Sequence, residues 1–304
     1  MQHIRDTLIL LRPTHWIKNA VVLLPVVFGR QMSDPYAWLA ALCAAVAFSL
    51  AASCCYIIND IRDAESDRLH PAKRNRPIAA GLVSVGNARL LSLGLCLAAL
   101  LTAGVMSLPV LVCLAAYMLL QAAYTHWLKH KAIADVICIA MGFVLRAVCG
   151  ALAIHVAVSP WLFICMFTLC LFMGFCKRYS EIVTLADAET ARNHRLTLLA
   201  YTPDLLTHLI TVSAGIAVMA FLMYGLNERT VAQFGSSYFV YTLPVVIYGV
   251  FRFAMLSMSG RYKDPTDLIV HDVPFQMTVA VWMALILLVI RYGPWLRESL
   301  SGVR

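Results

Sequence analysis

The chain has 304 residues, of which 61% are hydrophobic and only 13% are charged, and its mean hydropathy is +0.78. This composition excludes a water-soluble globular protein and indicates a polytopic helical membrane protein. The net charge of +8 is interpreted as contact with a membrane surface and not with nucleic acid, because the basic residues gather beside the apolar segments.

Nine apolar stretches predict membrane spans, since a helix needs roughly 20 apolar residues to cross the hydrocarbon layer. The first is short and contains Pro25, which favours a tilted or kinked segment. We therefore predict an all-α fold of about nine transmembrane helices in a single integral-membrane domain, residues 1–304. The predicted spans are 17–30, 37–58, 88–106, 109–125, 133–154, 160–176, 207–226, 238–258 and 274–291.

The distribution of basic residues predicts the orientation of these spans. Of the 24 Lys and Arg residues, 17 fall in segments on the same side as the N-terminus and five on the other side. The positive-inside rule then places the N-terminus in the cytoplasm and the C-terminus outside the inner membrane. The acids share this bias, so we expect a soluble substrate at the cytoplasmic face and an apolar substrate within the bilayer.

The segment RPTHWIKN, from Arg12 to Asn19, begins before the first predicted span and continues into it. It places Trp16 at the expected level of the membrane interface, with Lys18 beside it. Two interpretations stay open: an aromatic and basic anchor, or contact with a phosphate through Lys18.

The strongest chemical signal is the stretch from Asn59 to Gly81, NDIRDAESDRLHPAKRNRPIAAG. Asp60, Asp63 and Asp67 are spaced by three and four residues, which aligns them on one face of a helix at the inner end of the second span. Stacked like charges repel one another, so the arrangement favours a bound cation. Mg²⁺ usually takes one or two carboxylates and completes its shell with substrate oxygens and water.

A basic run follows the acids directly. Lys73, Arg74 and Arg76 come without an acid among them. Carboxylates for a hard metal beside cations for phosphate indicate a site that handles a diphosphate. The alternative is a solvated loop whose charges serve topology only.

The inner end of the fourth span carries Tyr124 and Lys129, and Lys129 is predicted to face a phosphate. His126 and His130 have a metal-ligand spacing, but no acidic third ligand is near in the sequence, so we expect no metal there.

Two ionisable residues, Asp135 and Arg146, fall within the fifth span and roughly on one helix face. A charged group in a span costs about 2.5–3.5 kcal/mol on insertion scales and normally faces a cavity or a partner. Both are predicted to line the substrate pocket, and a structural salt bridge to another span is the alternative.

The run KRYSE, Lys177 to Glu181, lies at the inner end of the sixth span. Lys177 and Arg178 suit a phosphate as a point charge and a bidentate fork, respectively. The alternative is a topology determinant.

The last inner loop places Asp264 where it would cap a helix that begins at Pro265, with Asp267 in its first turn. Capping explains both acids, although Asp264, Asp267 and Asp272 could also hold a second metal or a sugar hydroxyl.

The motif NDxxDxxxD, at Asn59 to Asp67, resembles the first aspartate-rich motif of the UbiA-type prenyltransferase superfamily. The second motif of that superfamily, two Asp residues four apart after the sixth span, is missing, because Glu181, Asp187 and Glu189 have a different spacing. Five segments resemble instead the decaprenyl-phosphate phosphoribosyltransferase branch: RPTHWIKN, DRLHPAKRNRPIAAG, GFVLRAVCG, KRYSE and DPTDLIVHD. Together they run over nearly the full length of the chain.

This resemblance implies transfer of phosphoribose from phosphoribosyl pyrophosphate to a polyprenyl phosphate, with Mg²⁺ and release of pyrophosphate. It also implies a ring of helices around a central cavity open to the cytoplasm and to lipid, and it allows for a homotrimer. The predicted catalytic residues are Asp60, Asp63 and Asp67, and the predicted metal-binding residues are these three together with Asn59. The predicted substrate-binding residues are Lys18, Asn59, Lys73, Arg74, Arg76, Tyr124, Lys129, Arg146, Lys177, Arg178 and Glu181. The acid that replaces the second motif is left open among Glu181, Asp187, Asp264, Asp267 and Asp272.

Two other functions are consistent with the sequence. A UbiA-type prenyltransferase would use the same acids to ionise a prenyl diphosphate and alkylate an aromatic acceptor. A transporter is less favoured, because the charges gather at one face and paired interrupted helices are not evident.

Overall fold

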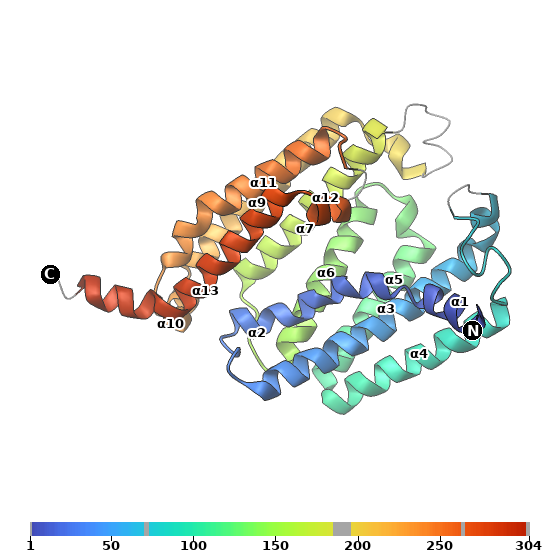
Figure 1. The fold of residues 1–304 in the computed structure, drawn as a ribbon, viewed down its shortest axis with the longest axis horizontal. Coiled ribbons are helices and arrows are strands. Elements are labelled where there is room, and N and C mark those ends of the chain that lie inside the picture. The colour runs from blue at the N-terminus through green and yellow to red at the C-terminus, as the bar shows by residue number, and fades with distance from the viewer. Residues whose placement is uncertain (1, 70–72, 185–195, 263–264, 302–304) are drawn as a thin grey trace. The chain divides into compact units, whose positions relative to one another are not determined.

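A computed structural model describes residues 2–69, 73–184, 196–262 and 265–301, and every regular element in these ranges is a helix (Figure 1). The predicted all-α class is therefore confirmed. Within the described ranges, eight helical stretches are long and apolar enough to cross a membrane: α3 (Pro35–Leu69), α4 (Val85–Met106), α5 (Leu108–His126), α6 (Ala134–Ala153), α7 (Pro160–Thr184), α9 (Pro203–Leu226), Tyr238–Met258, and the apolar part of α13 (Val273–Ser301). The seventh of these joins the 3-10 helix η4 (Tyr238–Thr242) to α11 (Leu243–Met258).

Shorter helices connect these elements or lie beside them. They are α1 (Gln2–Leu11), the 3-10 helix η1 (Pro13–Leu23), α2 (Leu24–Phe28), η2 (Leu128–His130), η3 (Leu196–Ala200), α10 (Glu228–Phe234) and α12 (Pro265–His271). The chain divides into two compact units, the first formed by Met1–Lys129 with Met141–Val158 and the second by His130–Ala140 with Ser159–Arg304. The prediction of a single domain stays a prediction.

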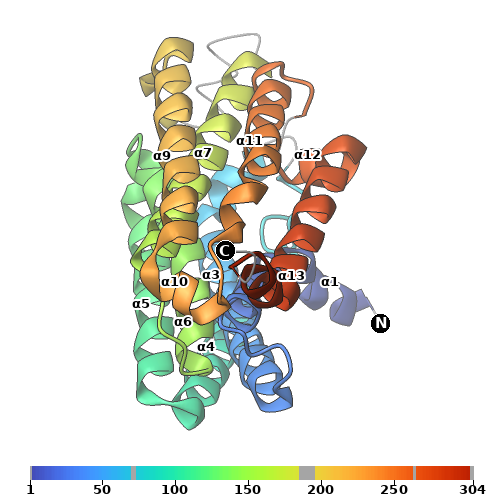
Figure 2. The same cartoon turned by 90° about the vertical axis from the view of Figure 1, so that its left-hand side faces the viewer.

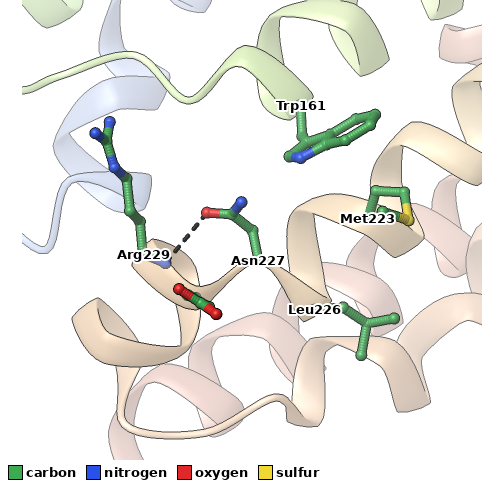
Figure 3. A pocket seen from close by; sticks show the side chains of 6 residues that line it. Trp161, Met223, Leu226, Asn227 and Arg229 are labelled. Carbon is green, nitrogen blue, oxygen red and sulfur yellow. Dashed lines mark hydrogen bonds between the residues drawn. The ribbon is translucent and has the colours of Figure 1, made fainter.

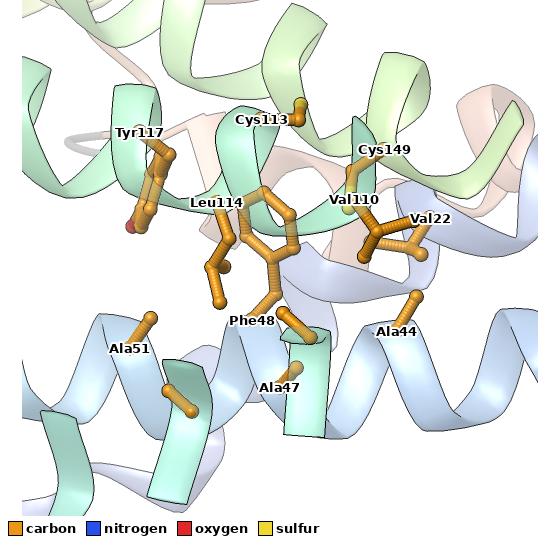
Figure 4. Packing of buried hydrophobic residues seen from close by; sticks show 12 residues of the cluster. Val22, Ala44, Ala47, Phe48, Ala51, Val110, Cys113, Leu114, Tyr117 and Cys149 are labelled. Atoms are coloured by element: carbon orange, nitrogen blue, oxygen red, sulfur yellow. The ribbon is translucent and has the colours of Figure 1, made fainter. Parts of the chain in front are cut away.

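In the first unit, α3, α4 and α5 pack around small side chains (Figure 4). Ala44, Ala47 and Ala51 give α3 a face of small residues that neighbouring helices can approach closely. Phe48 and Tyr117 fill the space between α3 and α5, with ring centroids 4.9 Å apart. This packing fixes α3, the helix that continues into the acidic motif.

The first predicted span, residues 17–30, forms no long α-helix; it lies in the 3-10 helix η1 followed by the short α2. This segment nevertheless runs antiparallel to α3. Its contacts are Arg12 with Asp60, Trp16 with Ser53, Asn19 with Ser49, and Val26 in a cluster with Ala37 and Ala41. Between Asp60 and Ala37, α3 rises about 34 Å, close to the hydrocarbon thickness of about 30 Å. A 3-10 helix rises about 2.0 Å per residue, so the stretch from Arg12 to Val26 covers about 27 Å, more than the roughly 21 Å of an α-helix of the same length. The ninth membrane crossing stays a prediction, and the contacts of η1 and α2 along the length of α3 support it.

In the second unit, α7 and α9 lie side by side, with α11 next to them (Figure 2). Phe172, Phe175 and Phe253 are buried between these helices together with Leu206. The close packing brings α7 against the first turns of α6, where Val136 contacts the position of Gly174.

Asp272 fastens α12 and α13 to α11. Its two carboxylate oxygens accept hydrogen bonds from Arg252 Nε at 2.7 Å and Nη2 at 2.9 Å, and one of them also accepts from the backbone N–H of Phe275 at 2.8 Å. The hydrogen bonds from Arg252 hold the pKa of Asp272 below its ordinary value. These contacts account for this acid without a metal. The predicted start of a helix at Pro265, with Asp267 in its first turn, is confirmed, whereas Asp264 lies outside the described residues.

Replacing Asp272 with Ala is expected to lower the thermal midpoint of the protein by about 2–4 °C, because α13 loses its N-cap and Arg252 its partner. Since the pKa of this carboxyl is lowered on folding, its contribution is present above the ordinary carboxyl pKa and is lost only as the pH falls further. Thermal unfolding of the detergent-purified variant measures the effect. Asp267→Ala is the matched control, because Asp267 is exposed; equal midpoints for the two variants would contradict the assignment.

Candidate active site

The last turns of α3 carry the predicted acids, and the structure buries two of them. Asp60 and Asp67 are each 3% exposed, whereas Asp63 is half-buried. Asn59 Nδ2 donates a hydrogen bond to Asp63 Oδ2 at 3.0 Å. The helix continues to Leu69, so the spacing of the acids is a helical spacing, as predicted.

Each acid is paired with a basic side chain from outside α3. Arg12 Nη2 lies 2.6 and 2.8 Å from the two oxygens of Asp60, Arg76 Nη1 lies 3.1 Å from Asp60 Oδ1 and 2.7 Å from Asp67 Oδ2, and Lys129 Nζ lies 2.7 Å from Asp63 Oδ1. We call these six residues the charged cluster. The repulsion expected among the stacked carboxylates is therefore offset by side-chain cations.

The donor set of the cluster can be compared with the needs of a metal ion. Among the residues that the structure describes, no group of three or more His, Cys, Asp or Glu side chains is arranged to hold a metal. Asp60 and Asp67 do converge on one point, because both contact the same nitrogen, Nη1 of Arg76. A metal cation can bridge these two carboxylates where Arg76 Nη1 now lies, provided that the guanidinium moves aside. The arrangement fits Mg²⁺ that shares its coordination shell with a substrate, as Mg²⁺ commonly does.

The loop between α3 and α4 is folded so that Arg76 returns to α3. Arg68 Nε donates to the backbone carbonyl of Ala79 at 3.2 Å, and Ile78 is buried in an apolar cluster with residues of α1, α3 and α4. These anchors at Ile78 and Ala79, shortly after Arg76, hold the loop beside α3 and so limit where the guanidinium can lie. The other two predicted phosphate contacts in this loop are the half-buried Lys73 and the exposed Arg74.

Arg146 is buried inside the first unit, with 4% of its surface exposed. Its guanidinium donates to Asn19 Oδ1 at 2.7 Å, to the carbonyl of Gly142 at 2.8 Å and to the Tyr117 hydroxyl at 2.9 Å. The rings of Phe48, Tyr117 and Phe143 lie 4.8–5.8 Å from Cζ. These acceptors are all neutral, so the salt bridge considered for Arg146 is not what holds it; aromatic faces and neutral oxygens stabilise the buried charge instead.

In the second unit, Asp135 and Arg178 form a buried ion pair. Asp135 is 0% exposed and Arg178 is 1% exposed, with 3.2 Å between Arg178 Nε and Asp135 Oδ2. Arg178 also contacts Glu181, and the Tyr201 hydroxyl donates to Asp135 Oδ1 at 3.2 Å. Burial raises the pKa of Tyr201 to about 12, so this hydroxyl keeps its proton. Of the two interpretations of Asp135, the structure shows the salt bridge to another helix. The contacts of Arg178 favour a structural role for this residue too.

Three further predicted residues lie at half-buried positions: Lys18 in η1, Tyr124 in α5 and Lys177 in α7. The exposed His126 contacts the guanidinium of Arg62 through Nδ1. Asp187 and Glu189 lie outside the described residues.

Two residues of the first unit contact predicted site residues but were not themselves predicted. Arg12 belongs to the motif RPTHWIKN, so its proximity to Lys18 and Trp16 was a usable signal. Tyr117 lies within an apolar span and carries no sequence signal beyond its hydroxyl, because only the fold brings it to Arg146.

A cavity of about 420 Å³ lies in the second unit, at the start of α7 and the end of α9 (Figure 3). It is lined by Trp161, Met223, Leu226, Asn227, Glu228 and Arg229. Arg178 lies about 26 Å further along the axis of α7 than Trp161, and no predicted site residue lines this cavity. The central cavity expected from the sequence therefore stays a prediction.

The fold and these contacts define a polytopic helical membrane protein in which paired acids and bases gather at the end of a membrane-spanning helix. The chain belongs to the UbiA prenyltransferase family, whose family model matches residues 20–279.

Two similar curated proteins are both named decaprenyl-phosphate phosphoribosyltransferase. The protein of Mycolicibacterium smegmatis is 34% identical over 286 residues, which cover 90% of this chain and 89% of that protein. The protein of Mycobacterium tuberculosis is 31% identical over 287 residues, which cover 93% of each. A solved structure of a UbiA homologue from Archaeoglobus fulgidus bound to GPP and Mg²⁺ matches with a TM-score of 0.71 at 19% identity, covering 95% of this chain and 99% of that chain. The likeness to this structure concerns the fold.

Proposed function

We propose that the protein transfers 5-phosphoribose from phosphoribosyl pyrophosphate to a polyprenyl phosphate and releases pyrophosphate, with Mg²⁺, at the cytoplasmic face of the inner membrane. The observation that carries the proposal is the charged cluster, in which three carboxylates and three cationic side chains meet at the end of α3. The names of the two phosphoribosyltransferase relatives, which align over about 90% of this chain, support the choice of substrates.

The cluster supplies both kinds of group that a diphosphate complexed with Mg²⁺ requires. Asp60 and Asp67 are the carboxylates that would hold Mg²⁺, and Asp63 with Asn59 completes the acidic face. When bound, Mg²⁺ neutralises the charge that develops on the departing pyrophosphate. Arg76 and Lys129 are positioned to donate charge-assisted hydrogen bonds to phosphate oxygens. Lys18, Lys73, Arg74 and Lys177 are proposed as further phosphate contacts.

The reaction requires little from the protein beyond the positioning of the two substrates. The bond from ribose C1 to the pyrophosphate oxygen breaks, and its electron pair leaves with pyrophosphate. An oxygen of the lipid phosphate forms the new bond to C1 from the opposite side. This nucleophile is already anionic at pH 7, so no general base is required, and orientation of the two substrates supplies much of the rate.

The acceptor would reach the site from the bilayer. Leu93, Leu97, Leu101 and Val105 form an exposed apolar stripe along α4, which is the surface expected of a helix in contact with lipid. We propose a cytoplasmic N-terminus and an external C-terminus, which the distribution of basic residues supports, and a homotrimer as the oligomeric state.

Incubation of the purified protein with Mg²⁺, labelled phosphoribosyl pyrophosphate and a polyprenyl phosphate tests the proposal. Label is expected in the organic phase, together with released pyrophosphate, and a chelator should abolish both. Consumption of a prenyl diphosphate with an aromatic acceptor, and no use of phosphoribosyl pyrophosphate, would instead establish the prenyltransferase alternative. Solute flux through proteoliposomes without any product would establish a transporter.

A further inference from the structure

Arg12 adopts a backbone conformation that residues with side chains rarely take. Its φ is 51° and its ψ is 58°, in the left-handed region. Such conformations are disfavoured for residues other than glycine and persist where the surroundings impose them, which is common at ligand-binding positions. The conformation ends α1 and turns the chain into η1 at the level of Asp60.

Neighbouring contacts impose this conformation. The fully buried Ser53 donates its hydroxyl to the carbonyl of Leu11 at 2.8 Å and accepts a hydrogen bond from Trp16 Nε1 at 3.0 Å. Residues on both sides of Arg12 are thus tied to one side chain of α3. The ring of Tyr56 lies 5.2 Å from the guanidinium carbon of Arg12. Together these contacts direct the guanidinium to Asp60.

The guanidinium makes only part of the contacts it could make. Within the described residues, both of its hydrogen bonds come from Nη2, at 2.6 and 2.8 Å from the oxygens of Asp60. The side chain is 22% exposed, whereas Asp60 is 3% exposed. The donors on Nε and Nη1 are therefore available to an anion at the surface of the cluster, in the planar fork geometry that suits phosphate oxygens.

Oδ1 of Asp60 accepts hydrogen bonds from both Arg12 and Arg76, and Oδ2 accepts one from Arg12, so a divalent cation that binds Asp60 competes with these guanidinium groups for the oxygen lone pairs. A guanidinium and a divalent cation on one carboxylate would also repel each other unless an anion lay between them. A diphosphate supplies that anion.

We propose that Arg12 is an exchangeable cation of the site: it neutralises Asp60 until a divalent cation binds there, and it then donates to an oxygen of the diphosphate. This inference rests on the proposed function, in that it takes Asp60 as a metal-binding carboxylate. It adds Arg12 to the substrate-binding residues and gives it a role in the order of binding. The alternative is that Arg12 has a purely structural role and only holds Asp60 in place.

The two roles predict opposite changes in metal affinity. If Arg12 competes with the cation, Arg12→Gln should bind Mn²⁺ more tightly in the absence of substrate, by about fivefold or more. The same variant should bind inorganic pyrophosphate at saturating Mn²⁺ at least about 10-fold more weakly, since a charge-assisted hydrogen bond is lost. If Arg12 only orients Asp60, both affinities should fall.

Electron paramagnetic resonance of Mn²⁺ with the full-length, detergent-purified protein measures the first affinity, and isothermal titration with pyrophosphate measures the second. Arg89→Gln is the matched control, because it removes a positive charge from an exposed side chain in the first turns of α4, outside the charged cluster; wild-type affinities are expected. Arg12→Asn removes the guanidinium but tolerates the left-handed backbone, so it repeats the test if Arg12→Gln does not accumulate. Unchanged or weaker Mn²⁺ binding in both variants, or no Mn²⁺ binding by the wild type, would overturn the proposal.

These measurements do not depend on turnover, so the two proposals can fail separately. Tighter Mn²⁺ binding in Arg12→Gln without any phosphoribosyl transfer by the wild type would leave the exchange intact and remove the proposed function. Transfer by the wild type, with unaltered Mn²⁺ affinity in Arg12→Gln, would support the proposed function and overturn the exchange of Arg12 with the cation.

Discussion

Asp63→Asn is expected to lower the rate of phosphoribosyl transfer by at least about 100-fold, the cost of removing one preorganised electrostatic group from an active site. The change removes a negative charge from the acidic face that would hold Mg²⁺. It keeps the shape of the side chain, and an amide oxygen can still accept from Lys129 Nζ, which lies 2.7 Å from Asp63 Oδ1. Because Asp63 is half-buried at the end of α3, the protein should still fold and insert, and the label-transfer assay in membranes measures the loss.

Asp60→Asn is expected to abolish turnover as well, but it carries a second effect. Asp60 is buried and contacts both Arg12 and Arg76, so its neutralisation leaves two cations without their shared partner and destabilises the cluster. Glu65→Gln is the matched control for both variants, since Glu65 is an exposed acid on the same turns of α3. Activity close to that of the wild type in Asp63→Asn would remove the assignment of this face to a metal and diphosphate.

The acidic face could be predicted because its signal is local. Three Asp residues at helical spacing need only one helix to be brought together, and α3 does continue through them to Leu69. Their cationic partners could be predicted only in part. Arg76 follows in the next loop, whereas Arg12 lies 48 residues away from Asp60. A contact between distant segments depends on the packing of η1 against α3, which leaves no periodic pattern in the sequence.

Burial was the second property that the sequence did not reveal. Lys177 and Arg178 are neighbours in the same run, and both are suited to a phosphate. The structure separates them, because successive residues of a helix point in different directions: Lys177 is half-buried, while Arg178 is enclosed with Asp135. The type of residue thus predicted a phosphate contact for both, whereas the fold encloses Arg178 and leaves Lys177 the more exposed of the two.

The length rule for membrane helices also could not predict the structure of the first span. It assumes the rise of an α-helix, whereas Pro13–Leu23 is a 3-10 helix with a larger rise per residue. The contacts of this segment with α3, and not its length, indicate the depth that it covers.

Gly150→Ala is expected to prevent stable folding of the first unit. An ideal Cβ at this position of α6 would collide with the backbone carbonyl oxygen of Val22 in η1 and lie 2.9 Å from its carbonyl carbon. Overpacking costs about 1–3 kcal/mol when side chains can yield, and here the obstacle is backbone. η1 cannot easily retreat, because Asn19 is bonded to Arg146 and Arg12 to Asp60. The expected result is a strong loss of monodisperse protein in detergent and a thermal midpoint far below that of the wild type.

Gly94→Ala provides the matched control for this effect. Gly94 lies within α4, and a Cβ there would meet nothing within 4 Å. Because Ala is a better helix former than Gly by about 1 kcal/mol, this variant should be as stable as the wild type or slightly more stable. The two substitutions add the same methyl group to a membrane-spanning helix, so a difference between them reports on the approach of η1 to α6. A Gly150→Ala protein with the wild-type thermal midpoint would show that η1 does not pack closely against α6. The contacts of Arg146 with Asn19 and of Arg12 with Asp60, which depend on this packing, would then be in question.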